Sequence, residues 1–162
     1  MSVKGLMTET SYPYKAITGR TCLYNETAVK TPFNFGRFII PSCDDDQDCD
    51  RQKGAEALTK VEALKLAPSV CVNANKYWFD YVGGIFDLPC SCLFDFVNHC
   101  VVLSSYSPQN STVGIINSWG TDFGENGTMR LKVDFNSTDG DQRNPCGLFN
   151  YMTYVGVTDY QP

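Results

Sequence analysis

The stretch at residues 115–127 reads IINSWGTDFGENG, and it joins an apolar segment to a loop that glycines punctuate. β-Branched residues before the loop predict a strand over residues 113–118, and a second strand is expected over residues 127–134. Glycine adopts turn conformations that other residues avoid, so Gly120, Gly124 and Gly127 predict a tightly turned connection. The sequence therefore places Asn117 and Trp119 where a strand passes into this loop.

The rest of the chain predicts one helix followed by strands. A helix is expected over residues 54–66, because apolar residues recur there at helical spacing and Pro68 follows. Its apolar stripe consists of Ala55, Leu58, Val61, Ala63, Leu64 and Leu66. Further strands are expected over residues 33–40, 69–74, 98–105 and 151–158. This pattern predicts the α+β class, and residues 1–162 are expected to form a single domain.

Composition excludes several classes of function. The chain has 162 residues, of which 43% are hydrophobic and 19% charged, as in ordinary globular proteins. Its formal net charge of -5 argues against nucleic-acid binding, which needs clustered lysines and arginines. The sequence contains no apolar run as long as the ~20 residues of a transmembrane helix.

Cysteines and glycosylation sequons indicate an oxidising compartment. There are 8 cysteines, and Asn-x-Ser/Thr sequons begin at Asn25, Asn110, Asn126 and Asn136. We therefore expect an extracellular protein or one in the lysosomal or endomembrane lumen. Residues 1–20 have no apolar core of a signal peptide, so a secretory signal is expected upstream of them.

An acidic loop runs from Cys43 to Asp50. Its alternating aspartates resemble a calcium loop, but an EF-hand needs Gly at the sixth position and Glu at the twelfth. Cys49 and Ala55 stand there, so a solvated turn is the favoured interpretation and no metal ion or cofactor is expected. A disulfide between Cys43 and Cys49 is plausible from their proximity, although connectivity does not follow from sequence.

The chain has one histidine, His99, at the start of an expected strand. The simplest interpretation of His99 is a polar residue at the end of a strand, with no catalytic role. The segment at residues 96–103 with His99 and the segment at 115–127 with Asn117 together resemble the histidine and asparagine motifs of papain-like, cathepsin-type cysteine peptidases. Three more passages fit the same family in the same order: Tyr12-Pro13-Tyr14 with Cys22, residues 84–90, and Cys146-Gly147-Leu148.

The resemblance implies a fold and two catalytic roles. The fold would be the C-terminal (right-hand) antiparallel β-barrel-like domain of the papain-like fold, with a flanking helix. In this family a cysteine thiolate attacks a peptide carbonyl, and an imidazole serves as acid and base. By resemblance His99 is that acid/base, Asn117 orients it, and Trp119 covers the hydrogen bond between them.

The family's nucleophile lies upstream, in a Gln…Cys-Gly-Ser-Cys-Trp passage that does not occur in these residues. The resemblance therefore implies the C-terminal half of a peptidase, with a Cys-bearing N-terminal half supplied by another segment or chain. Cys100 cannot replace the nucleophile, because neighbours on a strand point to opposite faces. We interpret Cys100 as a small core residue.

The resemblance also implies a disulfide and a substrate pocket. Cys90 and Cys146 match a family disulfide, whereas the family partner of Cys22 lies upstream. The S2 specificity pocket would be lined by Val72, Val97, Cys100 and Tyr151.

Two functions follow as hypotheses. The first is a peptidase that cleaves peptide substrates once a Cys-bearing half is present. The second is a catalytically inactive papain-like domain that acts as a structural or binding module. The second is motivated by the nucleophile that these residues lack and by departures from the family pattern at Ser105, Ser107, Ile116 and Tyr151. A calcium- or glycan-dependent surface module is a third and weaker idea.

Overall fold

The structure is a computed structural model that describes residues 7–15, 17–19, 21–28, 35–39 and 51–157. The chain forms two compact units, one of Met1–Phe38 with Val155–Pro162 and the other of Ile39–Tyr154. We call the second the sheet unit, and it contains both candidate catalytic residues. The expectation of a single domain over residues 1–162 stays a prediction.

The first unit contains a 3-10 turn, η1 (Glu26–Ala28), and most of strand β1 (Phe35–Ile39). Tyr12 is an anchor of this unit, because its hydroxyl accepts a hydrogen bond from the Leu23 amide at 3.2 Å. The same hydroxyl lies 3.9 Å from the sulfur of Cys22, which is exposed and forms no disulfide within the described residues. The motif around Tyr12 and the Cys22 segment are thus neighbours in space.

The strands of the sheet unit are β2 (Ser69–Val72), β3 (Ile85–Phe86), β4 (His99–Ser107), β5 (Thr112–Ile116) and β6 (Thr128–Lys132), and β7 (Met152–Val157) begins there. The strand order is β1-β7-β2-β4-β5-β6-β3. The pairs β2–β7, β2–β4, β4–β5 and β5–β6 are antiparallel, and β3–β6 is parallel. The α+β class is confirmed, but the sheet is open rather than closed into a barrel.

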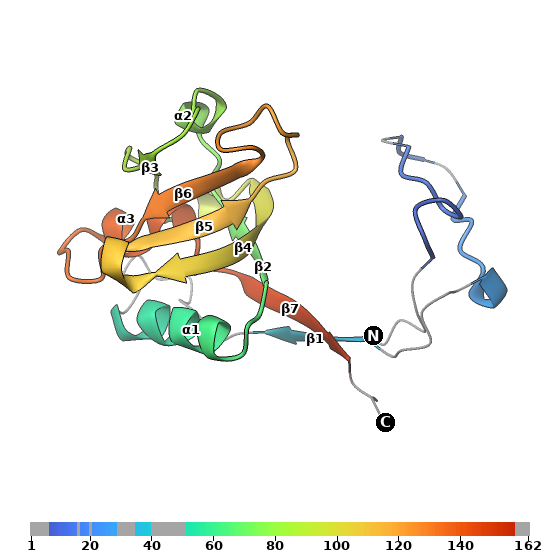
Figure 1. The fold of residues 1–162 in the computed structure, drawn as a ribbon, viewed down its shortest axis with the longest axis horizontal. Helices are drawn as coiled ribbons and strands as arrows, with labels where there is room; N and C mark the ends of the chain where they lie inside the picture. Colours follow the sequence, from blue (N-terminus) through green and yellow to red (C-terminus); the bar gives the residue numbers. More distant parts are fainter. Residues whose placement is uncertain (1–6, 16, 20, 29–34, 40–50, 158–162) are drawn as a thin grey trace. The chain divides into compact units, whose positions relative to one another are not determined.

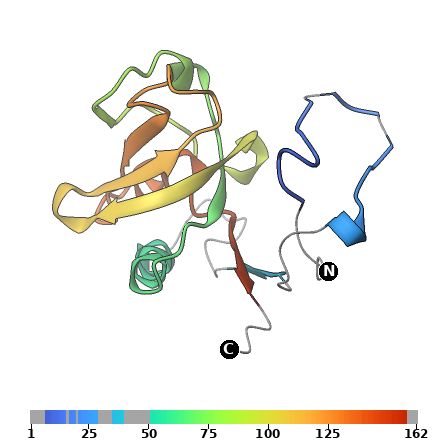
Figure 2. The ribbon, with the colours of Figure 1, turned by 45° about the vertical axis from the view of Figure 1, so that its right-hand side comes forward.

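Helix α1 (Arg51–Ala63) contacts β4 (Figures 1 and 2). It buries Ala57, Leu58 and Val61 in the core. Leu58 and Val61 belong to the predicted stripe, whereas Ala57 does not, and the predicted Ala63 is exposed. The helix ends three residues earlier than predicted, since Lys65 adopts a left-handed conformation with φ of 49°. Leu64 is consequently 58% exposed instead of facing the core.

The sequence did not predict the short elements of the sheet unit. They are α2 (Lys76–Phe79), α3 (Gly140–Arg143), η2 (Phe94–Phe96), η3 (Pro108–Asn110) and η4 (Pro145–Gly147). Side chains of Asn75 and Asp139 cap α2 and α3 by accepting hydrogen bonds from backbone amides. Elements of three or four residues are too short to show helical periodicity, which explains the omission.

The core lies on the face of β2 and β4 that carries Val70, Val72, Val101 and Leu103, all buried. Antiparallel pairing sets Val70 opposite Val101 and Val72 opposite His99. His99 therefore belongs to the same face as this apolar set, at the end of β4 where the core reaches the surface. Within the described parts of the chain, no helix combines the length and apolarity needed to cross a membrane.

Candidate active site

His99 and Asn117 come together because β4 and β5 are antiparallel neighbours. His99 opens β4, and Asn117 directly follows β5, so the start of one strand lies beside the end of the other. His99 Nε2 lies 2.9 Å from Asn117 Oδ1. The sequence placed the two residues 18 positions apart, and the hairpin between them brings their side chains into hydrogen-bonding distance.

The hydrogen bonds of Asn117 fix which histidine nitrogen carries a proton. Asn117 Oδ1 also accepts a hydrogen bond from the Ser118 amide at 2.8 Å, which identifies this atom as the oxygen. His99 Nε2 must then be the donor of their shared bond. His99 Nδ1 remains for a second partner, as the imidazole of an acid/base pair requires.

Aromatic side chains cover this hydrogen bond. The Trp119 ring stacks on His99 with centroids 5.0 Å apart, and Phe79 stacks on Trp119 at 4.9 Å with rings nearly parallel. The Trp78 ring meets both His99 and Trp119 edge-on, at 6.5 Å and 6.3 Å. Exclusion of water by these rings strengthens the polar contact beneath them.

The sequence predicted the position of Trp119 from its motif but missed Trp78 and Phe79. Both lie on the four-residue α2, which gave no helical signal. The adjacent aromatic pair was the available clue, although aromatic residues of this kind usually serve the core. Trp78 indeed does so, since it is fully buried, whereas Phe79 is 71% exposed.

The 117–128 loop, which connects β5 to β6 and includes Thr128 as the first residue of β6, is closed at its base. The Asn117 amide donates to the Gly127 carbonyl at 3.0 Å. Gly120, Gly124 and Gly127 all have positive φ, of 88°, 52° and 89°, in line with the predicted turns. Gly124 also allows a close approach, because a Cβ there would lie 2.6 Å from a Tyr81 ring carbon.

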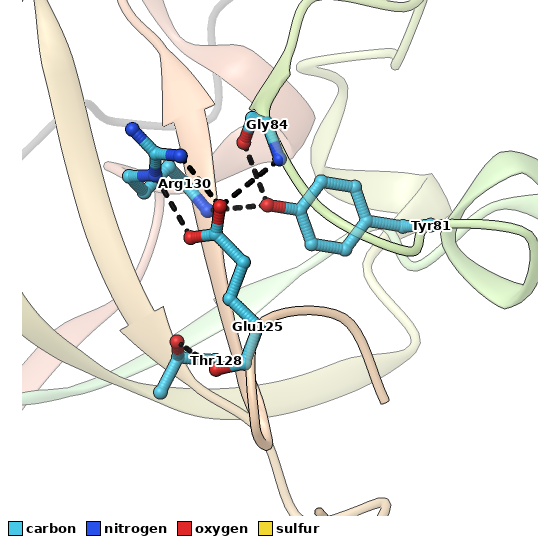
Figure 3. A network of polar contacts seen from close by, with 5 residues as sticks. All are labelled: Tyr81, Gly84, Glu125, Thr128 and Arg130. Atoms are coloured by element: carbon cyan, nitrogen blue, oxygen red, sulfur yellow. Dashed lines mark hydrogen bonds and ion pairs between the residues drawn. The ribbon is translucent and has the colours of Figure 1, made fainter. Parts of the chain in front are cut away.

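A polar network fastens this loop to its surroundings (Figure 3). Arg130 donates to both carboxylate oxygens of Glu125, and the Gly84 amide donates to Oε1 at 3.0 Å. The Arg130 guanidinium and the Gly84 amide hold the pKa of Glu125 below its usual range. In turn, Glu125 raises the pKa of Arg130, and burial raises that of Tyr81.

Two disulfides lie among the described residues of the sheet unit. The predicted Cys90–Cys146 bond is present, with Cα atoms 4.7 Å apart. The second, Cys71–Cys100, was not predicted, and it joins directly opposed residues of β2 and β4 whose Cα atoms are 4.1 Å apart. The interpretation of Cys100 as a core residue is therefore wrong, because Cys100 is exposed on the face opposite His99.

The structure does not gather the four S2-pocket candidates. Val72 is fully buried beside His99, whereas Cys100 points to the other face of the sheet. Tyr151 is 47% exposed and its ring packs against Phe94 at 5.6 Å. Val97 is half-buried next to η2. Val72 shares its face of the sheet with its cross-strand partner His99, and Cys100, as the next residue after His99, points to the other face.

The remaining sequence candidates have separate positions. Cys92 is a buried free thiol, and burial raises its pKa to about 11. All four sequon asparagines, Asn25, Asn110, Asn126 and Asn136, are exposed. Cys43, Cys49 and the acidic loop lie outside the described residues. Among the residues that the structure does describe, no group of three or more His, Cys, Asp or Glu side chains could hold a metal ion.

Comparison with known proteins identifies the family. The model of the papain family of cysteine proteases matches residues 1–155, and the chain belongs to this family. Cysteine proteinase 1 of Dictyostelium discoideum is 27% identical over 157 residues, which cover 92% of this chain and 39% of that protein. Testin-2 of Rattus norvegicus is 35% identical over 159 residues, which cover 93% of this chain and 41% of that protein.

A solved relative has the same fold. The crystal structure of a cysteine protease of Carica candamarcensis, in complex with E-64, matches with a TM-score of 0.70 and 26% identity, covering 96% of this chain and 63% of that one. The chain thus spans about two fifths of the length of these curated relatives.

Proposed function

We propose that this chain is the His/Asn-bearing half of a papain-like cysteine peptidase, which hydrolyses peptide bonds once a Cys-bearing half completes the site. The observation that carries the proposal is the 2.9 Å hydrogen bond from His99 to Asn117 beneath Trp119. Membership of the papain family of cysteine proteases supports the proposed peptidase function.

In the proposed reaction, His99 Nδ1 accepts the proton of a cysteine thiol supplied from outside the 162 residues. The thiolate attacks the peptide carbonyl carbon, and the imidazolium then protonates the leaving amine. Water attacks the resulting thioester while the imidazole takes its proton, which releases the acid and restores the thiol. Asn117 holds the ring through Nε2 in both halves of the cycle, because a neutral acceptor suits imidazole and imidazolium alike.

The test uses a preparation that contains this chain together with a Cys-bearing half. We expect it to cleave a fluorogenic peptide amide and to be labelled at cysteine by an epoxide inhibitor. Exchange of His99 for Ala should lower kcat/KM by roughly 10²–10⁴-fold, the range for a lost general acid–base group. Asp87→Asn is the matched control, because it removes an exposed ion pair with Lys132 away from the site.

Material that contains both halves, is folded, and yet shows neither turnover nor labelling would refute the peptidase function. That outcome would favour the second candidate, an inactive papain-like domain that binds a partner. Phe79 and Val82, which are 71% and 87% exposed, favour this candidate as apolar contact points for another protein surface.

We also propose that the protein works in an extracellular or lysosomal lumen. Two disulfides within the described residues and the exposed sequon asparagines support this location, because disulfides persist in oxidising compartments. A mass decrease after treatment with an endoglycosidase, using protein from its native source, would show that sequons are occupied. An unmodified mass of the native protein would count against this assignment.

A further inference from the structure

One carboxylate, that of Glu125, joins three separate segments of the sheet unit. Glu125 lies in the 117–128 loop, Arg130 lies on β6, and Gly84 lies in the turn before β3. Arg130 Nε donates to Glu125 Oε2 at 2.8 Å, and the Gly84 amide, 41 positions away in sequence, donates to Oε1 at 3.0 Å (Figure 3). Arg130 contacts both oxygens of the Glu125 carboxylate, and such a bidentate ion pair fixes the orientation of the two side chains as well as their distance.

Tyr81 adds a second connection between the same segments. Its hydroxyl donates to the Gly84 carbonyl at 2.7 Å and accepts from the Arg130 amide at 3.3 Å. The Tyr81 ring also packs against Phe123 of the loop, with centroids 5.8 Å apart. The turn after α2 and the 117–128 loop are therefore held together by polar and apolar contacts on both sides of Glu125.

The aromatic cover comes from the 117–128 loop and from α2, the helix that directly precedes the turn. Trp78 and Phe79 come from α2, whereas Trp119 comes from the loop. The stack of Phe79 on Trp119 and of Trp119 on His99 can form only if the two backbones keep a fixed separation. Phe79 is largely exposed, so burial in the core does not hold its ring in place.

We propose that Glu125 is a positioning residue that holds Trp119 over the His99–Asn117 hydrogen bond by clamping the 117–128 loop to the turn after α2. Glu125 acts through the backbone and through Trp119, since its carboxylate bonds to Arg130 and Gly84. The effect on the cover stands on the geometry alone, and an effect on turnover rests on the proposed function.

The charge state of Glu125 makes the clamp pH-dependent. Arg130 from β6, together with the Gly84 amide, lowers the pKa of Glu125, while the Tyr81 hydroxyl faces it from the turn after α2. A carboxyl whose pKa is lowered by folding stabilises the folded form above its unfolded pKa, and this contribution is lost as pH falls through the folded pKa. The contacts of Glu125 with Arg130 and Gly84 should thus persist at mildly acidic pH and be lost at lower pH, where the carboxylate becomes protonated.

Acrylamide quenching of tryptophan fluorescence measures the cover directly. The chain has 2 tryptophans, of which Trp78 is fully buried and Trp119 half-buried, so collisional quenching reports mainly Trp119. We expect Glu125→Gln to raise the quenching constant by about twofold, as local opening exposes the ring. Asp87→Asn removes the Asp87–Lys132 ion pair, which also ends on β6, and should leave quenching unchanged.

The NMR signal of the His99 Nε2 proton gives an independent readout. It should be sharp in the unmodified chain and in Asp87→Asn, and it should broaden in Glu125→Gln because the covered hydrogen bond becomes open to water. If Glu125→Gln fails to fold, Arg130→Lys keeps the charge but loses the fork, and it should show the same changes to a smaller extent.

A lowered melting temperature in Glu125→Gln, with quenching and the His99 signal both as in Asp87→Asn, would overturn the proposal. A pH titration decides further, because quenching of the unmodified chain should rise at acidic pH and that of Glu125→Gln should not. None of these readouts needs a nucleophile. The failure of the clamp and the failure of the peptidase function are therefore distinguishable.

Discussion

Removal of the Cys71–Cys100 disulfide should lower the free energy of unfolding of the sheet unit by a predictable amount. The bond closes a loop between residues 29 positions apart. In the chain-entropy model such a cross-link stabilises by about 3.6 kcal/mol at 25 °C, because it restricts the unfolded chain. Cys100 is exposed and Cys71 half-buried, so replacing both by Ala removes little packing and leaves this term dominant.

The matched comparison is the Cys90–Cys146 bond, which spans 56 positions. The same model gives about 4.2 kcal/mol for that separation. Cys90 and Cys146 are buried, so their exchange for Ala also loses core contacts and should cost more than the loop term alone. Stability should therefore fall in the order unmodified chain, Cys71→Ala/Cys100→Ala, Cys90→Ala/Cys146→Ala.

Equilibrium unfolding in urea, followed by circular dichroism, measures these losses. The slope against urea should rise in both double variants, because a chain with one cross-link fewer exposes more surface when it unfolds. A loss of less than about 1 kcal/mol for Cys71→Ala/Cys100→Ala would refute the reasoning, since the chain-entropy model gives about 3.6 kcal/mol for this loop.

Three further predictions concern single side chains. Leu58→Ala should destabilise the chain by about 2–5 kcal/mol in urea unfolding, because Leu58 is fully buried, whereas Leu64→Ala on the exposed end of the same helical stretch should cost less than about 1 kcal/mol. Iodoacetamide at pH 8 should modify the exposed Cys22 before Cys92, whose buried thiol has a pKa raised to about 11, and peptide mass mapping that finds Cys92 modified first would contradict this. In the completed peptidase, Asn117→Ala should lower kcat more than it raises KM, and a change confined to KM would argue against its orienting role.

Much of the fold could be predicted, because strands and the long helix leave periodic patterns. The strand segments around His99 and Thr128 were located to within a few residues, and helix α1 was displaced by about one turn. The shift at its end came from Lys65, whose left-handed conformation no local rule required. The open sheet also differs from the barrel-like expectation, since closure depends on how the edge strands pair.

The candidate site was also predicted only in part. The motifs named His99, Asn117 and Trp119, and the disulfide of Cys90 with Cys146 followed from family resemblance. Cys71 and Cys100 were not paired, because a cross-strand bond depends on register, and a shift by one residue would turn both side chains to the other face.

By itself the sequence determined the class of the fold and the residue types of the site, since residue order and periodicity carry that information. Only the tertiary structure decided which side chains meet. It set His99 beside Asn117, laid Phe79 and Trp119 over them, and clamped the loop through Glu125 to Gly84. Gly84 and Glu125 are 41 positions apart, and contacts at such separations depend on how strands pair and loops close rather than on any local pattern.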